Sequence, residues 1–222
     1  MQIIGSLPEL IRNDVGLYEG NLIPYFSILF THPRNLWSGY HNFRHMTHVP
    51  WLCSLACKFY AETLTKREMR DLLIAALFHD FDHTGRAGKD DINIALAIRG
   101  LRRHVLPEDK EHLEDIENLI VVTEYPYKVL SSGLSLSAQI IRDADLCQAF
   151  SVAWLQEVIF GLAREWNKKP VEVLQMQEPF LRALKFNTDW ARETFPQQDI
   201  EAKIAEARAL IELVNGAPPT TS

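Results

Sequence analysis

A segment rich in helix-forming residues sets the strongest constraint on the fold of this chain. Residues 67–81 read REMRDLLIAALFHDF and end apolar on all sides, a pattern typical of a central, buried helix. The run delivers His79 and Asp80 to the end of that helix. Charged side chains are rarely buried unless they are paired or bound to a metal ion. The sequence therefore predicts a core helix that ends in a buried His-Asp pair, and this pair needs a charged partner or a metal ion.

Helical patterns cover most of the remaining chain. We predict further helices over residues 107–123, 149–166 and 199–214, the last of which stops at Asn215-Gly216. Strand signals are weak, and the β-branched residues of 119–123 continue a helical pattern. At typical helix lengths the chain holds about eight or more helices. We therefore predict an all-α fold, with a kink or a restart where Pro50 removes a helical hydrogen bond.

Length and composition indicate one packed domain. The chain has 222 residues, of which 47% are apolar, and domains commonly run from about 50 to 250 residues. We predict a single domain over residues 1–215 and a flexible C-terminal tail over 216–222, which is rich in Pro and Thr. The sequence leaves open whether the chain forms an oligomer.

Charge and cysteine content favour a cytoplasmic protein. A net charge of −6 argues against nucleic-acid partners and anionic membranes, which need concentrated Lys and Arg. We see no signal peptide, and no apolar run approaches the roughly 20 residues of a membrane span. Three cysteines make a poor disulfide framework and fit a reducing compartment. For Cys53 and Cys57 we favour burial over metal binding.

Metal-competent side chains concentrate in three segments, residues 40–48, 78–85 and 142–146. His41 and His45 are four residues apart, so on a helix they lie on the same face. Two His and two Asp contributed by three helices can surround one ion and leave positions for water. Mixed imidazole and carboxylate ligation suits Zn, Mn, Fe or Co better than Mg. These segments therefore predict a divalent-metal site in a central cleft.

The order of these motifs resembles the HD metallohydrolase superfamily. Tyr-His-Asn-x-x-His at 40–45, Ala-Ala-Leu-Phe-His-Asp-x-Asp-His at 75–83 and Ala-Asp-Leu at 144–146 are similar to the catalytic core of the cyclic-nucleotide phosphodiesterases. Small bacterial HD phosphohydrolases share a similar layout, and Asn93 and Thr123 fit it. The resemblance spans roughly residues 36 to 150. It implies a single helical HD domain, and three motifs in order are a far more specific signal than a lone His-Asp pair.

The resemblance also implies roles for individual residues. The metal ligands would be His45, His79, Asp80 and Asp145, with Asp143 as the second choice for the last position. His41 would be the general acid that protonates the leaving oxygen. His83 and Asp82 would lie beside a second metal ion, His83 acting through a bridging water, and Asn93 would support the site from behind. We take His41, Asp80, His83 and Asp145 as the candidate catalytic residues.

These assignments predict a divalent-metal-dependent phosphohydrolase. One or two ions of Mn, Fe, Co, Ni, Zn or Mg would provide hydroxide at neutral pH, and the substrate would be a phosphate ester of a nucleotide or a similar small molecule. The sequence does not separate monoester from diester, and it identifies neither Gln175 nor Gln177 as a purine-binding glutamine. An Arg among residues 44, 99, 102 and 103 is a candidate phosphate contact.

Two other functions stay open at this point. One is an HD-fold diiron oxygenase, which requires His83 or His104 as a true ligand; His104 and His112 are the histidines that would complete a dinuclear site. The other is a nucleotide sensor that binds without turnover, against which the presence of His41 argues.

Overall fold

The computed structural model describes residues 6–88, 90–127 and 133–216. These residues form helices joined by turns and loops, with no strand among them. The all-α prediction is confirmed. The α-helices are α1 (Leu7–Arg12), α2 (Ile23–Thr31), α3 (Phe43–Phe59), α4 (Lys66–Phe78), α5 (Asp90–His104), α6 (Leu113–Val121), α7 (Leu136–Leu146), α8 (Gly161–Glu165), α9 (Pro170–Ala183), α10 (Asp189–Thr194) and α11 (Gln197–Val214). Shorter segments are the 3-10 helices η1 (Pro107–His112) and η3 (Cys147–Phe150) and the π-helix η4 (Leu155–Phe160).

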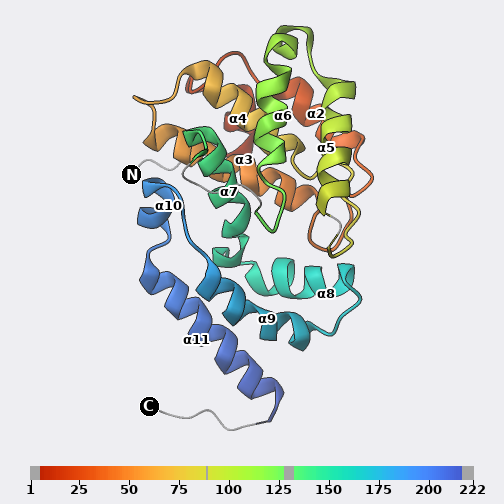
Figure 1. Cartoon of the computed structure of the whole chain (residues 1–222), viewed down its shortest axis with the longest axis vertical. Helices are drawn as coiled ribbons and strands as arrows, with labels where there is room; N and C mark the ends of the chain where they lie inside the picture. Colours follow the sequence, from red (N-terminus) through yellow and green to blue (C-terminus); the bar gives the residue numbers. More distant parts are fainter. Residues whose placement is uncertain (1–5, 89, 128–132, 217–222) are drawn as a thin grey trace.

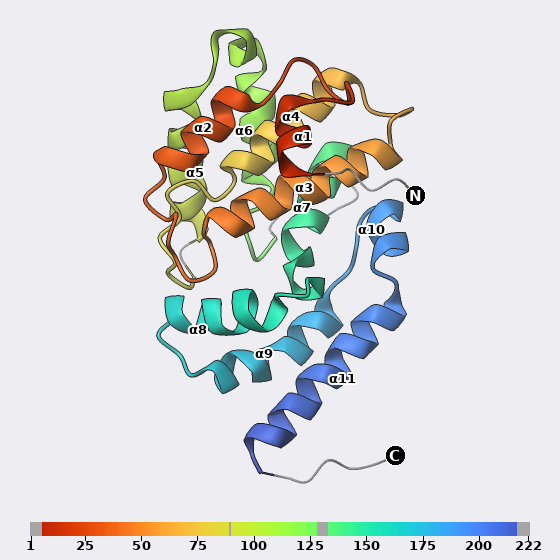
Figure 2. The same cartoon turned by 180° about the vertical axis from the view of Figure 1, so that it is seen from behind.

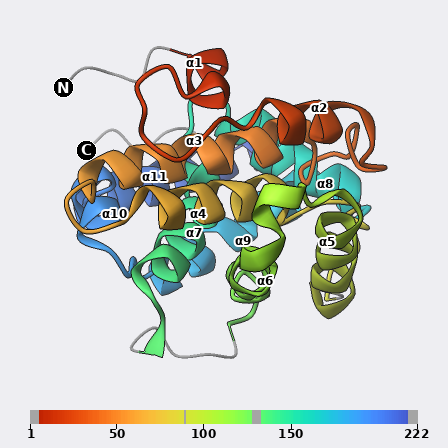
Figure 3. The same ribbon diagram turned by 90° about the horizontal axis from the view of Figure 1, so that it is seen from above.

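Helix α4 is the central helix that the sequence predicts. A capping box between Thr65 and Glu68 starts it, and every side chain from Met69 to Phe78 is buried. Helix α4 packs against α2, α3, α5, α6 and α7, and Figure 3 shows α3 and α4 side by side at the middle of the molecule. The helix ends at Phe78, so His79 and Asp80 follow its last turn.

Three predicted helices differ in detail from the structure. The first turns of the 107–123 segment form η1, and α6 starts only at Leu113. The 149–166 segment is broken into η3, η4 and α8 because Ser151 adopts an extended backbone. Helix α3 continues through Pro50, so the predicted restart is wrong. Proline removes one hydrogen bond there, and burial of Met46, Val49 and their neighbours on both sides of it keeps the helix intact.

Buried apolar side chains form two clusters. The main cluster joins α1 to α7 with α10, whereas the C-terminal cluster joins η3, η4, α8, α9 and α11. Figures 1 and 2 show α8, α9 and α11 gathered at one end of the molecule, with α7 leading towards them. All three cysteines are buried and free, as expected for Cys53 and Cys57.

No single helix in the described part of the chain is long and apolar enough to cross a membrane; Leu136–Phe150 and Leu155–Glu165 pass that test only together, across a 98° bend. The single domain over residues 1–215 stays a prediction. The predicted flexible tail lies, from residue 217 on, outside the described residues.

Candidate metal centre and active site

Two asparagines position the first motif. The side chain of Asn42 caps α3 by accepting hydrogen bonds from the backbone of Arg44 and His45, which fixes His45 in the first helical turn. Buried Asn35 donates to the backbone oxygens of His41 and Asp80, at 2.7 and 2.9 Å. The loop before α3 is thereby tied directly to the His-Asp turn after α4.

The four predicted metal ligands converge. His45 Nε2 lies 3.0 Å from Asp145 Oδ1, 3.3 Å from Asp80 Oδ2 and 3.3 Å from His79 Nε2. His79 Nε2 lies 3.4 Å from Asp80 Oδ2 and 3.5 Å from Asp145 Oδ1. Four side-chain atoms, one from each residue, therefore surround a common point. They come from α3, from the turn after α4 and from α7.

The chemistry of these donors fits a divalent cation. The carbonyl oxygen of Ala76 accepts the proton on His79 Nδ1 at 2.7 Å, which leaves Nε2 of His79 to face the centre. Asp80 Oδ2 is buried and has no hydrogen-bond partner among the described residues. Two nitrogens and two carboxylate oxygens at this spacing form a donor set that one divalent cation can satisfy. The group His45, His79 and Asp145 also meets the distance requirement for a single ion.

Electrostatics around this centre favour positive charge. Burial opposes ionisation of Asp80, but the nearby His79, His41 and His83 hold its pKa well below the usual range. Burial likewise opposes ionisation of Asp145, and its contacts with His45 and His79 lower its pKa. Both carboxylates are therefore anions at neutral pH, as metal ligands must be.

His41 forms a pair with a residue that the sequence analysis did not single out. Glu165, at the end of α8, accepts the backbone N–H groups of Tyr40 and His41 through Oε1, each at 2.8 Å. Its Oε2 lies 2.7 Å from His41 Nδ1. Burial disfavours the charged ring, but the negative charge of Asp80 and the hydrogen bond to Glu165 raise the pKa of His41. The raised pKa favours the doubly protonated ring, in which Nδ1–H faces Glu165 and Nε2 carries the second proton.

A glycine pair allows this contact to form. Gly39 precedes Tyr40, and Gly161 starts α8. A Cβ atom at Gly39 would overlap the carbonyl oxygen of Gly161, and one at Gly161 would lie 2.6 Å from the carbonyl oxygen of Gly39. The two backbones approach so closely that neither position accepts a side chain, and in Figures 1 and 2 α8 lies next to this loop. The approach brings Glu165 to His41.

His83 stacks on His41, with ring centroids 3.6 Å apart. The backbone N–H of Gly85 donates to His83 Nδ1 at 3.0 Å, and Nε2 lies 2.7 Å from Asn93 Nδ2. Asn93 is itself fixed because Oδ1 accepts from the backbone and hydroxyl of Thr84. Burial lowers the pKa of His83 to about 4. Asn93 thus contacts the ring of His83 and also lines the cavity beside it, and its role behind the metal ligands stays a prediction. His83 is a neutral neighbour of His41.

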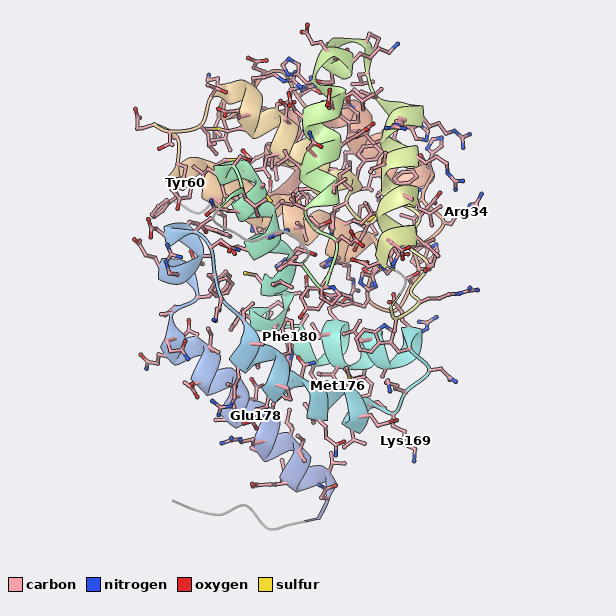
Figure 4. The ribbon with its side chains drawn as sticks, viewed as in Figure 1. Arg34, Tyr60, Lys169, Met176, Glu178 and Phe180 are labelled. Atoms are coloured by element: carbon pink, nitrogen blue, oxygen red, sulfur yellow. The ribbon has the colours of Figure 1, made fainter. Side chains whose placement is uncertain are left out.

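The metal centre opens into a cavity of about 500 Å³ between the two apolar clusters. Beside the polar groups near the centre, its wall includes a group of residues from η4 to α9, namely Val158, Leu162, Trp166, Met176, Gln177 and Phe180. Figure 4 places Met176 and Phe180 on α9, with Glu178 directed towards α11. Gln177 lines the cavity, whereas Gln175 is exposed and does not. The cavity combines a polar end with a mainly apolar wall, as small-molecule sites usually do.

Some predicted residues lie elsewhere. Asp143, the second choice for the last ligand, accepts hydrogen bonds from the backbone and side chains of Asn187 and Thr188. The Asp82 carboxylate accepts the backbone N–H of Arg34 and does not line the cavity. His104 makes an edge-on ring contact with His32 and a tilted one with Phe81, and His112 lies beside Asp71. No Arg or Lys in the described ranges lines the cavity, which removes Arg44, Arg99, Arg102 and Arg103 as phosphate contacts in this conformation.

Glu165 and Asn35 were missed because each acts across a long sequence separation. A glutamate in a helical run is most often a solvated surface residue, and no local motif marks Glu165. The one sequence signal for Glu165 was Gly161, which lies four residues earlier on the same helical face. A small residue there allows another backbone to come close.

Comparison with known families agrees with this geometry. Residues 40–99 match the family model of the 3'5'-cyclic nucleotide phosphodiesterases. The predicted resemblance is therefore confirmed over the first two motifs, which contain His41, His45, His79, Asp80 and His83. No curated protein matches the chain. Asp145 and Glu165 lie beyond the matched residues, and their place in the site rests on the geometry alone.

Proposed function

We propose that this protein is a divalent-metal-dependent phosphodiesterase that acts on a nucleotide. One observation carries the proposal. A centre of two imidazoles and two carboxylates lies on the same cavity as a further imidazole, that of His41, which is paired with the carboxylate of Glu165. The match of residues 40–99 to the cyclic nucleotide phosphodiesterases supports this assignment and makes cyclic nucleotides the first substrates to test.

In this proposal His45, His79, Asp80 and Asp145 hold the metal ion. When bound, a divalent ion lowers the pKa of a coordinated water towards about 7 and polarises a phosphoryl oxygen. Asp80 and Asp145 stay ionised and orient the attacking group. His41 keeps Nδ1–H on Glu165 Oε2 and directs Nε2–H into the cavity. As the phosphorus–oxygen bond breaks, the electron pair goes to the leaving oxygen, which takes the Nε2 proton.

The charge of the cavity wall favours a diester over a monoester. Asp80, Asp90 and Asp145 line the cavity, and the described residues offer it no Arg or Lys. A phosphomonoester carries close to two negative charges at pH 7, whereas a diester carries one. Among the described residues, only His41 and the bound metal ion would offer positive charge, so a substrate with one negative charge meets less repulsion than one with two. The apolar wall and Gln177 offer a stacking surface and an amide to a nucleobase.

The test combines metal analysis with a substrate panel. Purified protein is incubated with Mn²⁺, Co²⁺, Ni²⁺ or Mg²⁺ and with 3',5'-cyclic nucleotides, 5'-monophosphates, bis(4-nitrophenyl) phosphate and 4-nitrophenyl phosphate. We expect hydrolysis of the diesters and much slower hydrolysis of the monoesters. Asp80→Ala should lose both metal and activity, whereas His41→Gln should keep the metal and lose about 10²–10⁴-fold in kcat.

Four outcomes would contradict the proposal in different ways. Preference for monoesters would overturn the diester assignment. Nucleotide binding by calorimetry without turnover under any metal would indicate a sensor. Two tightly held irons per chain with an optical spectrum that changes in air would indicate an oxygenase. A fully active His41→Gln variant would exclude His41 as the general acid.

A further inference from the structure

A second group of metal-competent side chains lies next to the metal centre. One ligand atom from each of His41, His83 and Glu165 lies within 4.8 Å of the others. This group shares no side chain with the centre formed by His45, His79, Asp80 and Asp145. The side chain of Glu165 is 4% exposed and that of His83 is also 4% exposed, so water competes weakly for either one.

The donor set is that of a transition-metal site. Two imidazoles and one carboxylate are a common ligand set for Zn²⁺, which bonds to nitrogen and oxygen at about 2.0–2.2 Å. Ligand atoms of one such ion lie at most about 4.4 Å apart, so a group whose atoms all lie within 4.8 Å of one another needs at most a small inward shift. Glu165 Oε2 and His41 Nδ1, at 2.7 Å, are already closer than that limit.

The surroundings hold these groups in place for binding. The carboxylate of Glu165 is oriented by the backbone N–H groups of Tyr40 and His41 through Oε1, which leaves Oε2 as the oxygen that faces the ring of His41. The ring of His83 is held by Gly85 and Asn93. Because His83 Nδ1 accepts the backbone N–H of Gly85, this nitrogen carries no proton, and an ion that replaces the N–H of Gly85 there meets an unprotonated ring nitrogen.

We propose that His41, His83 and Glu165 form a second, inhibitory site for Zn²⁺ or a similar transition-metal ion. The entering ion takes the place of the proton between His41 Nδ1 and Glu165 Oε2, and that proton leaves to solvent. His41 then retains one proton, on Nε2, as a neutral metal-bound imidazole, which is a far weaker acid than the imidazolium. Binding at this site therefore removes the acid needed by the leaving group. The inhibition rests on the proposed function, whereas the binding itself does not.

Metal-binding stoichiometry tests the site without any substrate. The metal-stripped full chain is titrated with Co²⁺ by calorimetry and by visible absorption. We expect two bound ions for the unchanged chain. Glu165→Gln should weaken the second ion by about tenfold or more and leave the first. Asp145→Asn should weaken the first and leave the second. Glu157→Gln, which alters another buried carboxylate of the same helical segment, is the matched control and should bind both.

Proton release gives an independent readout. Calorimetry of the second ion in two buffers of different ionisation enthalpy should show one proton released where His41 starts protonated. One Co²⁺ per unchanged chain, or two in Glu165→Gln with unaltered affinity and spectrum, would overturn the proposal.

An activity measurement tests the inhibition. Hydrolysis supported by saturating Mg²⁺ should fall as Zn²⁺ is added, and His83→Gln should require about tenfold more Zn²⁺ for the same fractional loss. Equal inhibition of both chains would overturn the inhibitory role. Absence of hydrolysis with every metal would count against the proposed function, while the Co²⁺ titration would still decide whether the second site exists.

Discussion

Glu165 Oε2 lies 2.7 Å from His41 Nδ1, and this one contact joins the last turn of α8 to the loop that precedes α3. It connects the two apolar clusters of the fold at the edge of the cavity. It also fixes the His41 ring with Nδ1 facing Glu165, which leaves Nε2 for the proton-donor role that we propose.

The pH dependence of turnover should report this contact. Burial disfavours the His41 imidazolium, whereas Asp80 and Glu165 raise its pKa, so the acid is present at low pH and is lost as pH rises through that pKa. Glu165→Gln removes one of the raising contributions, and the alkaline fall of kcat/KM should therefore begin at lower pH. The measurement is a kcat/KM profile of both chains with the same metal. Superimposable profiles would mean that Glu165 does not act through His41.

Metal binding should distinguish two aspartates that stand two residues apart. Asp145 faces the metal centre, whereas Asp143 holds Asn187 and Thr188. Chelation should lower the unfolding temperature, and added Mn²⁺ should restore it through mass action. In Asp145→Asn the restoration should be weak. Asp143→Asn should start from a lower unfolding temperature and still respond to Mn²⁺. Loss of the response in Asp143→Asn would make Asp143 a ligand.

The backbone approach of Gly39 to Gly161 should be needed for turnover more than for metal binding. Gly39→Ala puts a methyl group against the carbonyl oxygen of Gly161, which pushes the loop away from Glu165. We expect at least about a tenfold fall in kcat, since misplacing an acid forfeits part of its contribution of roughly 10²–10⁴-fold, with metal content unchanged. Gly133→Ala, where nothing lies within 4 Å of an added Cβ, is the control. Equal activity of the two variants would contradict this role.

A buried ion cluster on α4 and η1 should dominate stability away from the site. Asp109 is fully buried and accepts hydrogen bonds from Tyr25 and twice from Arg70, each at 2.7 Å. Asp109→Asn leaves the buried Arg70 without its counter-ion and should cost about 3–5 kcal/mol of unfolding free energy. Asp189→Asn, which breaks the surface pair with Arg192, should cost less than about 1 kcal/mol. Denaturant unfolding of both variants measures the difference.

The same cluster should make the free energy of unfolding depend on pH. Burial raises the pKa of Asp109, but the hydrogen bonds from Arg70 and Tyr25 outweigh it, so the folded pKa lies below the unfolded value. A lowered carboxyl pKa contributes stability above the unfolded pKa of about 3.9 and loses it as pH falls through the folded pKa. The stability gap between the unchanged chain and Asp109→Asn should therefore narrow in acid. A gap that is constant from pH 7 to pH 3 would contradict this origin.

The sequence by itself determined the helical class and most of the metal centre. Helical periodicity and the apolar run before His79 specify a buried α4, because an apolar helix of that length has no other stable place. The same run marks His79 and Asp80, since a buried His-Asp pair requires a partner of opposite charge or a metal ion, and the resemblance to the HD metallohydrolase motifs implies His45 and Asp145 as their fellow ligands. These features follow from the side chains of short segments, so they can be read from a single sequence.

Tertiary structure alone decided what surrounds that centre. Glu165 meets His41 from 124 residues away, and the distinction between Asp143 and Asp145 depends on which face of α7 meets the 187–188 segment. The sequence pattern cannot rank these contacts, because many glutamates and aspartates have equal local propensity. The close approach of two glycine backbones and the packing of α8 and α9 over the cavity determine which of these acidic residues reach the site. The packing of the helices, rather than the composition of the chain, therefore places Glu165 and the cavity wall beside the metal-binding motif and completes a candidate active site.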